Sequence, residues 1–224
     1  MMQKAPPPCV RILVLGAQEV GKSAVTVRFL TQRFIGEYSS QKDLLYCSQT
    51  QVTGSPVDVE ILDTSRDQTD SIPSEKLDWC SAFVVVYSVA SKSSFLVAAD
   101  CLRNLTSRGL PVLLLANKKD LEHAREVSSE EGRTIASELG DVLFAEVSAA
   151  EDYAEVADAF RILLNDACIS ISKCSNSNSS PTNTSSRRKI SVVSVSKIIS
   201  AMFGRGGAMI ADHHGQKKRP SLSL

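Results

Sequence analysis

The sequence feature that most constrains the fold is a glycine-rich loop between an apolar run and a stretch of helical period. Residues 16–23 read GAQEVGKS, a match to the pattern GxxxxGK[ST]. Two glycines let such a loop curl until backbone N–H groups and the next helix N-terminus point at phosphate oxygens. We expect Lys22 to neutralise phosphate charge and the Ser23 hydroxyl to ligate Mg²⁺. The predicted phosphate-binding residues are Gly16, Ala17, Gln18, Glu19, Val20, Gly21, Lys22, Ser23 and Ala24. The alternative is a glycine turn that binds nothing.

The rest of the chain, from residue 9 to about 170, alternates short β-branched apolar runs with longer stretches of helical period. That alternation predicts an α/β fold with one domain over residues 9–170, a six-stranded mostly parallel sheet and flanking helices. The expected strands are Val10–Leu15, Leu45–Val52, Val57–Leu62, Phe83–Ser88, Val112–Ala116 and Val142–Glu146. The expected helices are Lys22–Thr31, Ser93–Thr106, Ser129–Leu139 and Tyr153–Ala167, the third opened by a capping box of Ser128 and Glu131.

The charge is divided unequally along a chain whose net charge is zero. Residues 1–172 hold 16 Lys and Arg against 24 Asp and Glu, a net charge of −8, and residues 173–224 hold 9 against 1, a net charge of +8. Beside the domain we expect an N-terminal extension over 1–8, a Ser/Asn-rich linker over 171–186 and a basic tail over 187–224. The linker and tail are too poor in apolar residues to form a core, so we expect disorder there.

Within the tail, residues 190–203 place apolar side chains at helical spacing beside basic residues, which is typical of an amphipathic segment. Three interpretations stay open. The segment could contact a membrane surface or a partner's groove, it could dock onto the acidic body, or it could be a solvated basic tail without a specific ligand. Aromatic residues are not interleaved with the basic ones, so we expect no sequence-specific binding to nucleic acid.

Two later strands end in further motifs. The strand that ends at Ala116 leads into NKKD at residues 117–120, and the last predicted strand leads into EVSAA at residues 146–150. With these motifs the chain resembles the Ras superfamily of small GTPases over about residues 10–168. Residues 26–38 and 125–132 look most like the branch that includes the Ras-like estrogen-regulated growth inhibitor. The resemblance implies a three-layer P-loop NTPase fold.

The resemblance also implies a guanine site. Asp120 would accept hydrogen bonds from the two ring-edge N–H donors of guanine, Asn117 would brace the site and Lys118 would lie along the base. A backbone N–H at Ser148-Ala149 would meet the guanine oxygen. Phe34 would pack edge-on against the base, although a buried core position is an equally good interpretation for it.

Other positions depart from the family pattern. Gln41 stands where the family places the threonine that closes over Mg²⁺ and the γ-phosphate, with Ser39 and Ser40 out of register. The family's DxxG motif is present as DTSR over residues 63–66. It keeps Asp63, which would hold Mg²⁺ through a water, and has Arg66 in place of the glycine.

The residues that the family uses for hydrolysis also differ. Asp67 stands where the family has the glutamine that orients the attacking water, with Gln68 one residue late, so both are doubtful as catalytic residues. Gln18 would crowd the space that an incoming arginine finger occupies. Because fingers and water-positioning groups supply accelerations of about 10³–10⁵, we expect very slow turnover.

The sequence therefore predicts a small GTPase that binds GTP and GDP with Mg²⁺, hydrolyses GTP slowly and signals through effector proteins as a monomer. The alternative is a pseudo-GTPase scaffold that acts through its surface, including Tyr46 and the tail.

We expect a cytoplasmic protein, and the basic tail leaves peripheral membrane or nuclear placement open as alternatives. The N-terminus does not resemble a secretory signal, apolar runs are too short to cross a bilayer, and the six cysteines lack metal-site spacing. The C-terminus lacks a prenylation motif, and Cys174 is a weak candidate for acylation.

Overall fold

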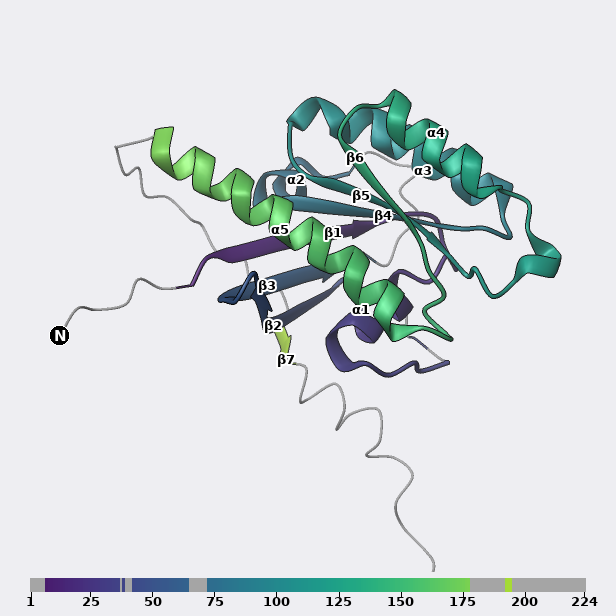
Figure 1. Cartoon of the computed structure of the whole chain (residues 1–224), viewed down its shortest axis with the longest axis horizontal. Coiled ribbons are helices and arrows are strands. Elements are labelled where there is room, and N and C mark those ends of the chain that lie inside the picture. The colour runs from purple at the N-terminus through teal and green to yellow at the C-terminus, as the bar shows by residue number, and fades with distance from the viewer. Residues whose placement is uncertain (1–6, 37, 39–41, 65–71, 178–191, 195–224) are drawn as a thin grey trace, which may run out of the picture.

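A mixed sheet forms the centre of the computed structural model, which describes residues 7–36, 38, 42–64, 72–177 and 192–194 (Figure 1). The strand order is β6-β5-β4-β1-β3-β2-β7. The β2–β3 pair is antiparallel and the other five pairs are parallel. The strands are β1 (Cys9–Leu15), β2 (Leu44–Val52), β3 (Ser55–Asp63), β4 (Ala82–Ser88), β5 (Val112–Asn117), β6 (Val142–Glu146) and β7 (Val192–Ser194).

Helices cover both faces of the sheet, as expected for strands that are apolar on both sides. Every residue of β4 and β5 is buried, which explains their continuous apolar sequences. One core includes side chains of α1 and α5, and a second core on the opposite face includes side chains of α3 and α4. The helices are α1 (Lys22–Thr31), α2 (Ser74–Trp79), α3 (Lys92–Leu105), α4 (Ser129–Glu138) and α5 (Tyr153–Ser177), with short 3₁₀ turns at Thr106–Arg108 and Glu122–Ala124.

The predicted α/β class and the six predicted strands are confirmed, with boundaries within two residues of those expected. The capping box is also present, because the Ser128 hydroxyl accepts from the Glu131 N–H while the Glu131 side chain accepts from the Ser128 N–H. The prediction that Tyr46 lies at the surface is wrong. This side chain is 2% exposed and packs in the core that α1 and α5 cover.

Helix α5 is longer than predicted. It continues past Ala167 to Ser177, into the stretch predicted as a linker. The side chains of Cys168 and Ile171 still pack against the core, so the apolar stripe of the helix extends one turn beyond the predicted end.

Strand β7 lies in the tail, inside the stretch whose spacing indicated an amphipathic segment. Its residues pair in parallel with Leu45–Cys47 of β2 and extend the sheet beyond the six predicted strands. The rest of residues 187–224 falls outside the described residues, as does the N-terminal extension up to residue 6.

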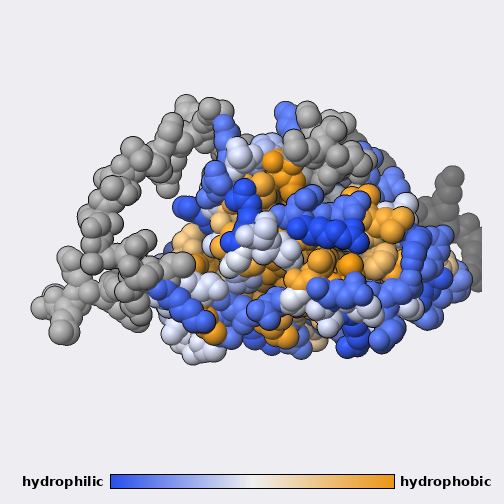
Figure 2. All heavy atoms as spheres, turned by 90° about the horizontal axis from the view of Figure 1, so that it is seen from above, coloured by the Kyte–Doolittle hydropathy of each residue, from blue (hydrophilic) through white to orange (hydrophobic). Residues whose placement is uncertain are grey.

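The molecular surface is mainly hydrophilic on the face that Figure 2 shows, where apolar residues form separate patches. The exposed large apolar side chains among the described residues are Phe34, Leu96, Ile162 and Ile169. None of the described helices is both long enough and apolar enough to cross a bilayer.

Candidate nucleotide site

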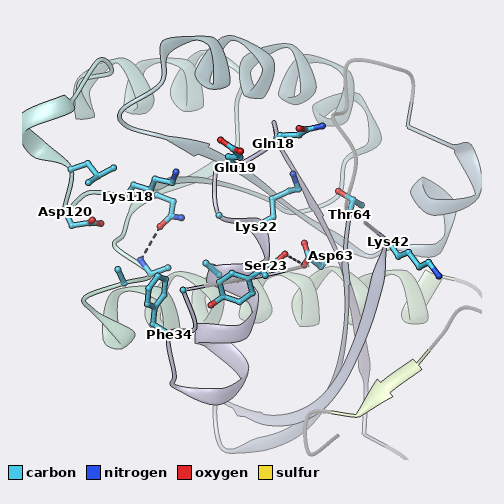
Figure 3. A pocket seen from close by; sticks show the side chains of 18 residues that line it. Gln18, Glu19, Lys22, Ser23, Phe34, Lys42, Asp63, Thr64, Lys118 and Asp120 are labelled. Carbon is cyan, nitrogen blue, oxygen red and sulfur yellow. Dashed lines mark hydrogen bonds between the residues drawn. The ribbon is translucent and has the colours of Figure 1, made fainter. Parts of the chain in front are cut away.

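Loops that follow the carboxyl ends of β1, β3, β5 and β6 surround a cavity of about 550 Å³. Parallel strands bring such loops to one edge of the sheet, which is where ligands bind in open α/β folds. Figure 3 shows Lys22, Ser23 and Asp63 toward one end and Lys118, Asp120 and Phe34 toward the other. The cavity is lined by Gln18, Glu19, Gly21, Lys22, Ser23, Ala24, Phe34, Gly36, Tyr38, Lys42, Asp63, Thr64, Asn117, Lys118, Asp120, Leu121, Ala149 and Ala150.

The glycine-rich loop between β1 and α1 depends on both of its glycines. Gly16 has φ +136° and Gly21 has φ +94°, in the region that side chains rarely adopt. A Cβ on Gly16 would lie 2.1 Å from the Val86 carbonyl oxygen, so the loop can approach β4 only without a side chain there. The backbone therefore curls tightly enough for the N-terminus of α1 to face the cavity.

Lys22, the first residue of α1, reaches back over this loop. Its side chain is 7% exposed, and its Nζ donates to the carbonyl oxygens of Gly16 at 2.9 Å and Ala17 at 2.8 Å. These bonds hold the ammonium group within the loop. The loop thus combines a fixed positive charge with a helix N-terminus, and both favour an anion.

Ser23 and Asp63 form the second polar pair at this end. The Ser23 hydroxyl donates to Asp63 Oδ2 at 2.6 Å. Burial raises the pKa of Asp63 to about 6, against the lowering effects of this hydrogen bond and of the Lys22 charge. The other carboxylate oxygen, Oδ1, is buried and has no hydrogen-bond partner among the described residues. A hydroxyl and a carboxylate are ligand types that Mg²⁺ accepts, so these residues fit a magnesium ion.

Asn117, at the end of β5, connects the two ends of the cavity. Its Nδ2 donates to the Val20 carbonyl in the glycine-rich loop at 2.9 Å, and its Oδ1 accepts from the Ala149 N–H at 3.2 Å. The side chain is 2% exposed, so both bonds are shielded from water. Three loops that are far apart in the sequence are therefore fixed to one another by one amide.

The opposite end of the cavity contains a second set of hydrogen bonds. The Ser148 hydroxyl donates to Asp120 Oδ1 at 2.6 Å, which orients the carboxylate. Lys118 has a φ of +64°, an unusual value for a residue with a side chain. The Lys119 N–H donates to the Val147 carbonyl at 3.2 Å and joins this loop to the one after β6.

Phe34 lies at the cavity and is 44% exposed, so the core interpretation of this residue is wrong. Its ring packs edge-on against Tyr38, with centroids 6.5 Å apart and planes at 62°. The Tyr38 hydroxyl accepts from the Ile35 N–H at 3.0 Å. These contacts place an aromatic wall beside the end of the cavity that holds Asp120 (Figure 3).

Most of the predicted site residues line this one cavity. Four of them lie behind its lining: Gly16 and Ala17 bind Lys22 Nζ, Val20 is in the core, and Ser148 binds Asp120. Ser39, Ser40, Gln41, Arg66, Asp67 and Gln68 fall outside the described residues.

Other lining residues were missed by the sequence analysis, among them Tyr38, Lys42 and Thr64. The Thr64 hydroxyl donates to the Val14 carbonyl at 2.8 Å and thereby fixes the end of β3 against β1. Its position directly after Asp63 is the signal that could have identified it. Lys42 has no comparable signal, because a single lysine in a polar stretch is ordinary.

Comparison with known proteins agrees with this geometry. The sequence model that describes the Ras family matches residues 11–168 of this chain. The chain is 38% identical over 176 residues to Ras-like protein family member 11B of Danio rerio, covering 73% of this chain and 70% of that protein. It is 44% identical over 158 residues to Ras-like protein family member 12 of Danio rerio, covering 67% and 61%.

A third relative, Ras-like protein family member 11A of Homo sapiens, is 37% identical over 179 residues, covering 75% of this chain and 72% of that protein. The chain thus spans about three fifths to three quarters of the length of these relatives. The predicted resemblance is confirmed, and the chain belongs to the Ras family of small GTPases, which bind GTP and act in signal transduction.

Proposed function

We propose that this chain binds GTP and GDP together with Mg²⁺ and hydrolyses GTP slowly as a signalling protein. The observation that supports this best is the Asn117 side chain, which joins a phosphate-type loop and a base-type loop around one cavity. A nucleotide has a charged end and a planar end, and the cavity offers a cationic loop at one end and a carboxylate beside an aromatic ring at the other.

The phosphate groups would lie at the glycine-rich loop. Backbone N–H groups at the start of α1 and the ammonium of Lys22 would bind their oxygens. Ser23 would hold Mg²⁺ directly and Asp63 would hold it through a water. When bound, the ion would neutralise part of the phosphate charge.

The base would be selected at Asp120. An ionised carboxylate accepts hydrogen bonds and donates none, so it pairs with the ring N–H and exocyclic NH₂ of guanine, which adenine does not present together. Ser148 would keep Asp120 in this orientation, and Lys118 and Phe34 would contact the faces or edge of the base. This arrangement favours guanine over adenine nucleotides.

Slow hydrolysis follows from the sequence around the phosphate end. Gln18 lines the cavity. By the family resemblance, its side chain would crowd the space that an incoming arginine finger would occupy. Asp67 would repel a polyphosphate and could not orient a water as glutamine does. We expect single-turnover hydrolysis of labelled GTP to be far slower than in an ordinary Ras-type protein, and an equal rate would contradict this part of the proposal.

A nucleotide titration tests binding itself. GTP and GDP should bind in the presence of Mg²⁺ and ATP should not. The Asp120→Asn variant should lose about 10- to 100-fold in affinity for GTP, since one acceptor becomes a donor. The same variant should gain affinity for xanthosine triphosphate, whose base has a carbonyl in place of the guanine amine.

The exposed Asp141→Asn change, on the loop before β6, is the matched control and should leave both affinities unchanged. If the purified chain carries no nucleotide and discriminates none of these ligands, the pseudo-GTPase scaffold is the correct interpretation. That outcome would remove the proposed binding function while leaving the family assignment intact.

A further inference from the structure

The outer edge of β2 is covered by the chain's own tail. Strand β7 pairs in parallel with β2, with Val192 opposite Leu45, Val193 opposite Tyr46 and Ser194 opposite Cys47. In Figure 1 β7 lies beside β2 at the end of the sheet, although about 140 residues separate the two strands in the sequence. The contact joins the acidic body to the basic tail.

An uncovered strand edge presents a row of backbone N–H and C=O groups that another extended peptide can pair with. β2 pairs with β3 along its whole length, from Leu44 opposite Asp63 to Val52 opposite Ser55. The other side of β2 is the outer edge of the six predicted strands, and β7 pairs with three residues along that edge. Three residue pairs make a short ladder, so this cover can be released at modest cost.

The covered positions lie next to the nucleotide cavity. Leu45 is three residues after Lys42, which lines the cavity, and Leu44 pairs with Asp63. Asp43 forms an ion pair with Lys76 of α2 at 2.6 Å. A peptide that took the place of β7 would therefore sit against the segments that border the phosphate end.

The tail pairs with this edge, and its net charge is opposite to that of the body. Fourteen residues, 178–191, connect α5 to β7, and a fully extended chain of that length spans at most about 50 Å. The basic triplet Arg187-Arg188-Lys189 precedes β7, and the body it docks on carries a net charge of −8. A tether of this length also gives the tail strand an effective concentration of about millimolar, so weak pairing suffices to keep it bound.

We propose that Val192–Ser194 is an intramolecular cover of the β2 edge, which an extended peptide from a partner protein must displace to add its own strand. The cover is autoinhibitory, because the partner competes with a tethered strand. This inference does not depend on nucleotide binding, and it applies equally to a switch and to a scaffold.

Amide hydrogen exchange on the full chain tests the cover. In a Val192→Pro, Val193→Pro double variant the tail strand cannot pair, because proline lacks the N–H and fixes φ. We expect exchange in residues 44–48 to accelerate at least threefold, while residues 112–117 of the central strand β5 stay unchanged. The matched control is Ser185→Pro with Ser186→Pro, also in the tail but outside β7, which should exchange like the parent. Unchanged exchange at 44–48 in the β7 variant would overturn the proposal.

A peptide of residues 187–199 supplies the second measurement. Added to the full-length double-proline variant, it should restore slow exchange at residues 44–48. At the same concentration it should protect the parent chain less, because the tethered strand already occupies the edge. The same peptide with prolines at 192 and 193 should have no effect. Equal protection by both peptides would show an attraction of charge alone and would refute the cover, as would a peptide effect of equal size on parent and variant.

Discussion

A Cβ atom on Gly21 would lie 2.3 Å from Nδ2 of Asn117, closer than side-chain atoms can approach. Asn117 cannot move aside freely, since that nitrogen donates to the Val20 carbonyl. Gly21→Ala should therefore abolish nucleotide retention and lower the free energy of unfolding by more than the backbone penalty alone. Urea denaturation and the nucleotide content of the purified protein measure the two effects.

Gly140→Ala is the matched control for that change. Gly140 has φ +95°, nearly the value at Gly21, but a Cβ there would meet nothing within 4 Å. The free energy of unfolding of this variant should fall only by the cost of a left-handed backbone with a side chain, about 1–2 kcal/mol, and the variant should keep its nucleotide. Equal losses of stability in the two variants would show that the contact with Asn117 does not matter.

Asn117→Asp separates the two hydrogen bonds of this side chain. The acceptor for the Ala149 N–H is retained, but the donor to the Val20 carbonyl is replaced by an oxygen. A buried carbonyl left without its donor costs about 1–3 kcal/mol. We expect lower stability and release of GDP that is about 10-fold faster or more, measured by displacement of a fluorescent nucleotide. A GDP release rate equal to that of the parent would mean that the link between the loops does not support binding.

The effect of metal removal on nucleotide binding should depend on Ser23. In the parent chain, chelation of Mg²⁺ should weaken GTP and GDP binding, because the phosphates lose a counter-charge. Ser23→Ala should bind more weakly in Mg²⁺ and respond little to chelation, as seen by calorimetry. Thr31→Ala, which deletes a hydroxyl bound to the Val27 carbonyl on the same helix, should respond to chelation as the parent does.

The stability of the α4 N-terminus should depend on pH. The ion pair with Lys92, with added hydrogen bonds from the Ser128 backbone and hydroxyl, lowers the pKa of Glu131 from 4.5 to about 2. A lowered folded-state pKa contributes stability that is present above pH 4.5 and is lost as the pH falls toward 2. Glu131→Gln should therefore reduce Tm at pH 7, with the difference shrinking toward pH 2.

Glu130→Gln is the control for that experiment, because it removes a negative charge from the same helix turn without touching the capping box. Its Tm should follow the parent more closely than Glu131→Gln does at pH 7. If the Glu131→Gln deficit in Tm were the same at pH 7 and pH 2.5, the assigned ion pair would be wrong.

Much of the fold was predictable because its signals are local. The apolar runs of β4 and β5 and the glycines of the phosphate-type loop each report their own geometry. Helix α2 was missed because six residues, Ser74–Trp79, are too few to show a period. Strand β7 was missed because its pairing depends on the distant edge of β2, which no local pattern records.

The residues of the candidate site were easier to predict than the hydrogen bonds that join them. Sequence motifs named Asp120 and Asn117 through resemblance, but the bond from Asn117 to Val20 spans 97 positions in the chain and follows only from the packed sheet. Phe34 had two possible environments, and only its 44% exposure distinguishes them. Where a residue's role depends on a distant contact, the sequence alone left alternatives open.

Lys118 has a left-handed backbone conformation, which lowers stability at a position whose side chain lines the cavity. Glycine would adopt a φ of +64° without a steric penalty, so a Lys118→Gly protein would be relieved of about 1–2 kcal/mol of backbone strain, partly offset by the greater freedom of glycine in the unfolded chain. It would also lose the side chain that lines the cavity. The chain therefore carries a strained backbone at this position, and what it gains is a cationic side chain at the wall of the cavity.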